Sequence, residues 1–310
     1  MQWTRSYQPD SQNNSLYTRA LIITLAGNIL LAAGKGVAAY ISGSAALYAD
    51  AANSVSDVAY SLLIVLGIWV ALRPPDLSHP QGHGRFEPLV GMAITFSMGL
   101  AGYEAARTSI ERLMQGGLSI QPGLPTLTLL ASAAVKAGMF LLIRQLAKRL
   151  NSPTLRTTAR DNLNDVLTSS AAFVGALGSF YLHPLLDPAA GLLVSIYIFL
   201  SALRAGRENL NFLTGSGASE ELRQRLVEAA ESVEGVQQVH QTIAEYSGPR
   251  LVVDMHVNVA ANLSFEEAHR INDEIIEHLE GISEVDRAYV HLEPEGEGLE
   301  DWQDEKDVSD

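Results

Sequence analysis

The sequence predicts a membrane-embedded, all-α bundle of six transmembrane helices, followed by a small C-terminal α+β domain. Six apolar stretches are each long enough to cross a bilayer, which takes roughly twenty residues. Residues 1–205 carry 14 Lys/Arg and 10 Asp/Glu, whereas residues 206–310 carry 7 and 25. After Gly215, helical and alternating apolar patterns follow one another in the order αββαβ. An apolar, mildly basic part joined to a strongly acidic one is typical of a membrane domain with an aqueous domain attached.

The bundle helices are predicted at residues 16–39, 45–72, 87–113, 124–149, 156–181 and 186–205. The second and fifth contain enough polar residues to weaken their hydropathy, as expected of helices that line a transport path. Residues 1–15 form a polar N-terminal segment. The first apolar run is too long for a cleaved signal peptide, so we expect no targeting segment.

The connections between these helices alternate in positive charge. The first-to-second and fifth-to-sixth connections contain no Lys or Arg. Basic residues gather at the opposite ends of the helices: Arg5, Arg19, Arg73, Arg85, Arg144, Lys148, Arg149, Arg156, Arg160, Arg204 and Arg207. The positive-inside bias therefore predicts a multi-pass protein of the inner or plasma membrane with both termini in the cytoplasm.

Residues 206–293 have the pattern of a small soluble domain. SEELRQRLVEAAESV predicts an amphipathic helix, and VQQVHQTIAEYSG with RLVVDMHVNVA predicts two strands around a Gly-Pro turn. Ser264 and Glu267 form a capping box that opens a helix to about Glu280, and EVDRAYVHLEP is a third strand. We expect a three-stranded sheet with both helices on one face. Residues 294–310 are mostly acidic and are predicted to be a disordered tail.

Two four-residue spacings inside the apolar stretches are the most informative motifs. Asn53 precedes Asp57 in the second helix, and Asp161 precedes Asp165 in the fifth. This spacing places both members of each pair on one face of a helix, one turn apart. Carboxylates at membrane depth are costly unless they face a bundle interior or bind an ion. Converging from two helices, these residues predict an oxygen site for a divalent cation.

Ion pairing is the alternative reading of these acids, because Lys35 and Lys136 also lie in apolar stretches. One buried ion pair would account for one acid, but not for paired acids at the same spacing on two helices. Carboxylate and amide oxygens favour Mn²⁺, Fe²⁺ or Mg²⁺, whereas imidazole would favour Zn²⁺ more strongly.

Two further groups of residues could bind metal. Asp76, His79 and His83 fall within a short loop, which could equally be a polar turn. In the C-terminal domain, His240 and His256 fall on adjacent predicted strands, and His291 and Glu293 share one face of the last strand. His269 lies on the helix between these strands. Each histidine alone would more often be structural, but together they favour a regulatory metal site.

Composition excludes several other classes of protein. The chain has no cysteine, which excludes disulfides, thiolate metal sites and cysteine catalysis. No basic stripe exists to neutralise nucleic-acid phosphates. The sequence lacks HExxH, GxSxG and phosphate-loop motifs, so we expect no enzyme and no catalytic cofactor.

The motifs ADAANSVSD, ARDNLND and HPQGHGRFEPL together closely resemble the cation diffusion facilitator family, over about residues 12–293. The resemblance implies a homodimer in the lipid bilayer, with six transmembrane helices per protomer and a cytoplasmic, metallochaperone-like αββαβ domain. It also implies alternating-access efflux of divalent metal in exchange for protons. By position, it assigns the transport site to Asn53, Asp57, Asp161 and Asp165, the loop site to Asp76, His79 and His83, and the cytoplasmic dimer site to His240, His256, His269, His291 and Glu293.

The chain departs from the family pattern in two places. Zinc-transporting members usually have a histidine in the transport site, where this chain has Asn53 and Asp161. The Asn-Asp-Asp-Asp set resembles manganese-exporting members and some iron-associated ones, so we expect Mn²⁺ or Fe²⁺ as substrate. Some members also pair a basic residue at the Arg85 position with an acid after the sixth helix, where this chain has Thr214; Glu208 is a candidate substitute.

Two alternatives remain open from the sequence. A Zn²⁺ exporter of the same family would use the histidine-rich sites. A membrane metal sensor or assembly scaffold would bind metal without transporting it. Accumulation of metal by proteoliposomes under a pH gradient separates the scaffold from a transporter.

Overall fold

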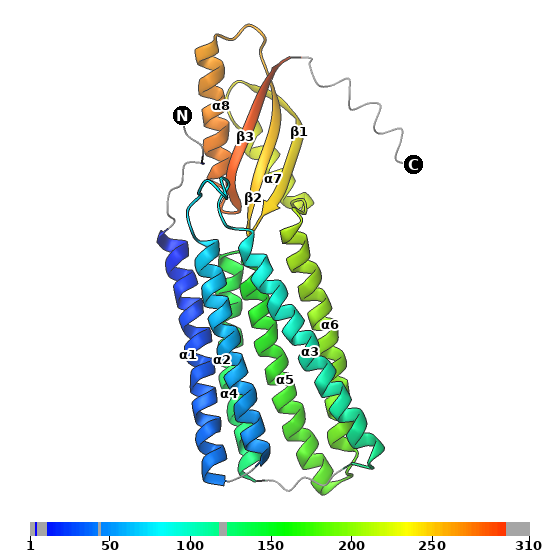
Figure 1. Ribbon diagram of the computed structural model, residues 1–310. Helices are drawn as coiled ribbons and strands as arrows, with labels where there is room; N and C mark the ends of the chain where they lie inside the picture. The colour runs from blue at the N-terminus through cyan, green and yellow to red at the C-terminus, as the bar shows by residue number, and fades with distance from the viewer. Residues whose placement is uncertain (1–3, 5–10, 43–44, 118–122, 296–310) are drawn as a thin grey trace, which may run out of the picture. The chain divides into compact units, whose positions relative to one another are not determined.

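A computed structural model describes residues 4, 11–42, 45–117 and 123–295. The chain divides into two compact units, Met1–Leu210 and Asn211–Asp310 (Figure 1). The first unit is built from long helices: α1 (Ser11–Ser42), α2 (Ala45–Ala71), α3 (Phe86–Met114), α4 (Leu124–Arg149), α5 (Pro153–Tyr181) and α6 (Leu186–Leu213), whose last turn enters the second unit.

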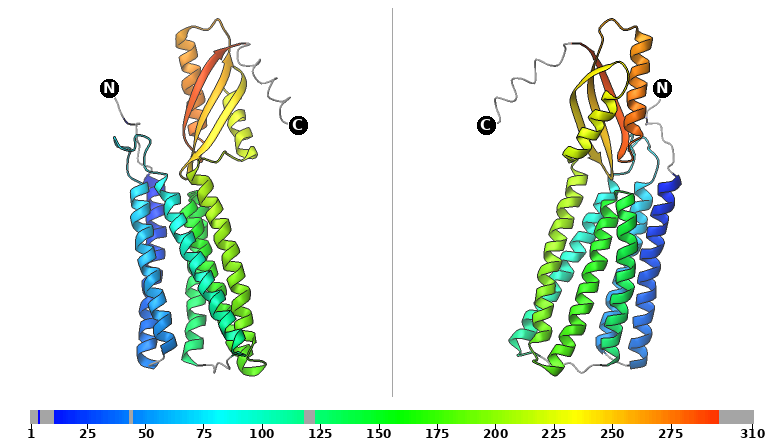
Figure 2. Two further views of the ribbon diagram at one scale, coloured as in Figure 1. Left: turned by 45° about the vertical axis from the view of Figure 1, so that its right-hand side comes forward. Right: turned by 180° about the vertical axis from the view of Figure 1, so that it is seen from behind.

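The six helices run side by side as a bundle, with α1 packed along α2 and α4 packed along α5 (Figure 2). Large apolar side chains cover the outside of this bundle; Phe96, Leu193 and Leu203 are each 70% exposed. Water-soluble proteins rarely expose so much contiguous apolar surface, whereas lipid-facing helices require it. Among the described residues, five helices are apolar and long enough to cross a membrane, and α5 is the one bundle helix that does not meet this criterion.

Helix α5 is long enough to span a bilayer, but its N-terminal half is charged. Arg156, Arg160, Asp161 and Asp165 all lie in this half and lower its hydropathy. The helix begins at Pro153, three residues before the predicted start at 156, because Ser152 caps it by accepting a hydrogen bond from the Leu155 N–H. The predicted count of six spans therefore depends on α5.

Helix α6 continues to Leu213, beyond the predicted end at 205. Its polar last turns are stabilised by partners on α5: Glu208 pairs with Arg156 at 2.7 Å and with Arg160 at 2.5 Å. The Glu208 carboxylate is therefore already paired within its own chain. Its suggested role as a substitute for the acid that some family members have after the sixth helix stays a prediction.

The C-terminal unit has the predicted order of helices and strands: α7 (Glu220–Glu231), β1 (Val236–Ser247), β2 (Arg250–Val259), α8 (Phe265–Glu280) and β3 (Val285–Pro294). The sheet order is β1-β2-β3, with β1 and β2 antiparallel and β2 and β3 parallel. The predicted capping box is confirmed, because Ser264 and Glu267 exchange hydrogen bonds at the start of α8.

One face of this sheet forms the core of the unit. Alternate β2 side chains, from Leu251 to Val259, are buried against α7 and α8, which both cover that face (Figure 2). The intervening β2 side chains, among them Asp254 and His256, lie on the open face. The predicted acidic tail of residues 294–310 falls outside the described residues, apart from its first two.

Candidate metal centres

The acids of the helical bundle converge on one basic side chain. Asp57 comes from α2 and Asp165 from α5, and the Lys136 ammonium of α4 lies 3.2 Å from the first and 2.6 Å from the second. Asp161, one turn before Asp165, interacts electrostatically with all three groups. The side chain of Lys136 is only 6% exposed. The predicted convergence of acids from two helices is therefore seen at Asp57 and Asp165, with a buried cation between them.

Polar contacts one helical turn after Asp57 hold α2 against α1. The Ser61 hydroxyl donates a hydrogen bond to the Asp57 carbonyl at 2.8 Å, and the Asn28 amide of α1 donates one to the Ser61 hydroxyl, also at 2.8 Å. Asn28 and Ser61 are both buried. Because buried polar groups are costly without partners, this chain of bonds favours one packing of α1 on α2. It therefore positions Asp57 from one turn away.

Sequence reasoning considered Lys136 only as the partner of a single acid. The structure gives it two, and neither spacing nor hydropathy predicts which helix packs against the acids. Among the described residues, two groups of His, Asp or Glu have ligand atoms that all lie within 4.8 Å of one another, and Asp57, Asp161 and Asp165 are not one of these groups. The Lys136 ammonium lies at the position that a metal ion would have to occupy in order to contact both carboxylates.

Two amides lie near these acids along the chain. Asn53 lies on α2 one turn before Asp57, as predicted, and its side chain is exposed at the surface of the single chain. Asn164, which sequence reasoning missed, is buried next to Asp165. Neither polar atom of the Asn164 amide has a hydrogen-bond partner among the residues that the structure describes. A buried amide without partners is unusual and often marks a place where an ion or another polar group binds.

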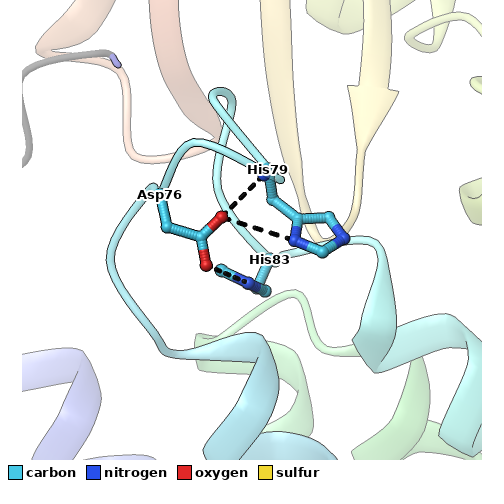
Figure 3. A group of neighbouring side chains, drawn as sticks. All are labelled: Asp76, His79 and His83. Carbon is cyan, nitrogen blue, oxygen red and sulfur yellow. Dashed lines mark hydrogen bonds and ion pairs between the residues drawn. The ribbon is translucent and has the colours of Figure 1, made fainter. Parts of the chain in front are cut away.

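The second centre lies in the loop between α2 and α3, where the three predicted residues come together (Figure 3). One Asp76 oxygen lies 3.6 Å from His79 Nδ1, and the other lies 3.5 Å from His83 Nε2. The backbone N–H groups of His79 and Ser78 donate hydrogen bonds to Asp76, and these bonds hold the pKa of its carboxyl below its usual value. The carboxylate is therefore ionised and aimed at two imidazoles, a donor set that suits Zn²⁺.

The third centre lies on the open face of the C-terminal sheet. Glu293 on β3 accepts contacts from two imidazoles, His240 Nε2 at 3.0 Å and His256 Nδ1 at 2.8 Å. The other nitrogen of His240 lies 3.0 Å from the amide oxygen of Asn258, which orients its ring. His291 lies beside this group, with Nε2 3.6 Å from Glu293. One carboxylate and two oriented imidazoles can hold a transition-metal ion.

His269 does not join this centre within a single chain. It lies on α8, which packs on the opposite face of the sheet, and its side chain is 65% exposed beside Asp273. The prediction grouped it with the other histidines by proximity in sequence. The sheet separates them, because α8 covers one face and the other predicted ligands lie on the opposite, open face.

Comparison with known proteins assigns a family to both units. The family model described as the cation efflux transmembrane domain matches residues 21–214. A second, described as the cation efflux protein cytoplasmic domain, matches residues 218–295. A solved structure titled MamM CTD, copper form, is 32% identical and covers 26% of this chain and 88% of its own, with a TM-score of 0.24.

Several relatives are similar along most of the chain. An uncharacterized transporter of Methanocaldococcus jannaschii is 33% identical over 89% of this chain and 97% of its own length. Magnetosome protein MamM of Magnetospirillum gryphiswaldense is 32% identical over 80% of this chain and 79% of its own. The manganese efflux system protein MneS of Bacillus subtilis is 25% identical over 88% and 94%. The chain therefore belongs to the cation diffusion facilitator family, a family of membrane-embedded cation efflux transporters.

Proposed function

We propose that this protein exports Mn²⁺, or Fe²⁺, from the cytoplasm in exchange for protons, by alternating access to a site formed by Asn53, Asp57, Asp161 and Asp165. The observation that carries the proposal is the convergence of Asp57 and Asp165, from two different helices, on one buried position. A dication that enters the bundle loses its hydration shell, and carboxylates are the groups best able to replace it.

The choice of metal rests on the chemistry of the donors. All four proposed ligands offer oxygen, and none offers imidazole. Hard oxygen ligands bind Mn²⁺ and Fe²⁺ well and give Zn²⁺ little advantage. A relative along most of the chain is named a manganese efflux system protein, which supports the same substrate.

Proton exchange follows from the crowding of acids. Three carboxylates near one another repel each other, so protons and metal compete for the same oxygens. A metal ion arriving from the cytoplasm displaces protons, and protons arriving from the other side help to release the metal. No separate proton path is needed for this exchange.

The proposal also covers the membrane topology, the oligomeric state and the domain bounds. Helix α5 crosses the membrane as a sixth span, because its charges serve the site and pair with Glu208. Both termini lie in the cytoplasm, and the protein acts as a homodimer. We propose a membrane domain at residues 16–205 and a metal-binding and dimerisation domain at 206–293, flanked by terminal segments 1–15 and 294–310.

A Zn²⁺ exporter is the second candidate, and the loop and sheet centres favour it because each combines two imidazoles with a carboxylate. In our proposal these centres regulate transport instead of carrying the ion. A competition assay in inverted vesicles decides between the two functions. Excess unlabelled Mn²⁺ should suppress the uptake of labelled Mn²⁺ more strongly than Zn²⁺ does.

The test of transport itself uses the purified chain in proteoliposomes with an imposed pH gradient. We expect Mn²⁺ to accumulate against its own gradient. Binding of Mn²⁺ without accumulation would show that the protein is a sensor or scaffold. The variant Asp57→Asn, which removes one charge at nearly constant volume, serves as the inactive control.

A further inference from the structure

Lys136 is the only cation that the described structure places between the proposed transport ligands. Its ammonium lies within hydrogen-bonding distance of both Asp57 and Asp165, and its side chain is 6% exposed. The contact joins three helices, because Lys136 comes from α4, Asp57 from α2 and Asp165 from α5. A buried lysine bound to two acids is not explained by the capping or packing of its own helix.

We propose that Lys136 is a tethered counter-cation which the transported metal must displace, and that it thereby sets both the affinity of the site and the release of the ion. This inference rests on the proposed function of the acid site. An ammonium and a dication cannot both lie between the same oxygens, because the two positive charges repel strongly at such short range. Binding of metal therefore requires the Lys136 ammonium to leave Asp57 and Asp165.

The side chain is suited to this exchange. Lysine is a compact point charge on a flexible four-carbon stem, so its ammonium can move several ångströms while the helix stays in place. Arginine would hold the two carboxylates with a planar, rigid fork. The choice of lysine therefore gives a counter-cation that is strong enough to hold the acids and mobile enough to yield to metal.

Charge balance supports the same role. In the absence of metal, the Lys136 ammonium offsets part of the negative charge of Asp57 and Asp165. Without Lys136, no ammonium would compete with the metal for these oxygens, and the metal would be released more slowly. Lys136 also supplies one positive charge that protons would otherwise have to supply when the metal leaves.

The test compares Lys136→Met, which keeps the length of the side chain and removes its charge, with the wild-type chain. The measurement is the rate of Mn²⁺ uptake into proteoliposomes as a function of Mn²⁺ concentration. We expect the half-saturating concentration to fall about tenfold or more, since the competing cation is gone, and the maximal rate to fall as well, since release is slower. Lys136→Arg keeps the charge and should not lower the half-saturating concentration.

Lys148→Met is the matched control, because it makes the same change on the same helix at an exposed position. It should leave both parameters at the wild-type values. If Lys136→Met folds poorly, excess Mn²⁺ during purification should restore its folding, because the metal replaces the missing ammonium between the acids. A Lys136→Met protein that Mn²⁺ does not stabilise would overturn the inference.

The outcomes separate this inference from the proposed function. Uptake that depends on Asp165 but has an unchanged or higher half-saturating concentration in Lys136→Met would overturn the counter-cation role alone. Absence of Asp165-dependent uptake in the wild-type protein would overturn the proposed function and the inference together. A lower half-saturating concentration combined with a lower maximal rate would support both.

Discussion

The acid site of the helical bundle and the histidine centre of the C-terminal sheet differ in the groups that hold their polar side chains together. In the bundle, Asp57 and Asp165 are held by a charged side chain from a third helix. On the sheet, His240 and His256 are held by one carboxylate, Glu293, and all of these residues come from neighbouring strands. Both arrangements hold together, through contacts among protein groups, side chains that we propose as ligands for a cation.

The two sites differ in the protein contacts that an arriving metal ion would have to displace. In our proposal a metal in the bundle must move the tethered Lys136 ammonium, so its binding depends on charge and is easily reversed. On the sheet a metal would replace only the contacts of His240 and His256 with Glu293, and the strand register maintains the geometry. The first arrangement suits an ion in transit, and the second suits an ion that stays bound and stabilises the domain.

Removing one acid from the bundle should have the largest effect of any change. Asp165→Asn deletes a charge that offsets dehydration of the dication, and an amide cannot replace that charge. We expect Mn²⁺ uptake to fall at least about 100-fold, while expression and dimerisation remain normal. Asp254→Asn changes an exposed acid of the C-terminal sheet in the same way and should transport normally. Transport by Asp165→Asn at the wild-type rate would refute the site assignment.

Replacing oxygen donors of the bundle with nitrogen donors should give the bundle site the metal preference expected of the histidine centre on the sheet. In the double variant Asn53→His and Asp161→His, imidazoles replace one amide and one carboxylate. We expect the ratio of Zn²⁺ to Mn²⁺ uptake to rise by about tenfold, since imidazole is a softer ligand. An unchanged ratio would show that selectivity is determined outside this site.

Weakening the sheet centre should have a smaller effect on transport. Replacing His256 and His291 with alanine removes imidazoles from the open face, so bound metal can no longer offset repulsion between two acidic domains. We expect transport to fall by severalfold without being lost. Small-angle scattering of the detergent-solubilised protein, with and without metal, should show compaction in the wild type only. Identical wild-type profiles under both conditions would count against this coupling.

A change at the α8 capping box should affect stability slightly and transport not at all. Hydrogen bonds from Ser264 lower the pKa of Glu267, so its contribution is present above the usual carboxyl pKa and is lost as the pH falls toward the lowered value. In Glu267→Gln, the first turn of α8 should exchange its amide hydrogens a few times faster at neutral pH, and the difference should vanish in acid. Glu266→Gln, an exposed change in the same turn, is the control; equal effects of the two variants would exclude a specific role of the cap.

The sequence was sufficient to predict features that depend on local spacing. The capping box at Ser264 and the four-residue spacings of Asn53 with Asp57 and of Asp161 with Asp165 follow from the geometry of one helix. The strand alternation of His291 and Glu293 follows from that of one strand. Helix ends were predicted less well, because α6 extends to Leu213 through ion pairs with another helix. Such partners lie far away in the sequence.

The spatial relations that the sequence did not predict share the same cause. Lys136 binds two acids because its side chain reaches both Asp165 on the neighbouring α5 and Asp57 on α2, and no pattern within α4 indicates this. Asn164 is buried without a hydrogen-bond partner among the described residues, although a polar residue beside Asp165 could have been solvated. His269 was grouped with the sheet histidines because its position on the other face follows only from the packing of α8.

Proton movement during metal transport tests the central claim most directly. The measurement is intravesicular pH in proteoliposomes at zero membrane potential while Mn²⁺ enters, with the wild-type protein and with Asp165→Asn. If metal and protons are competing occupants of one acid site, protons should leave the vesicles as Mn²⁺ enters, in a fixed ratio, and Asp165→Asn should abolish both movements. Entry of Mn²⁺ at the full rate without any counter-movement of protons would contradict the mechanism and indicate a uniporter or channel.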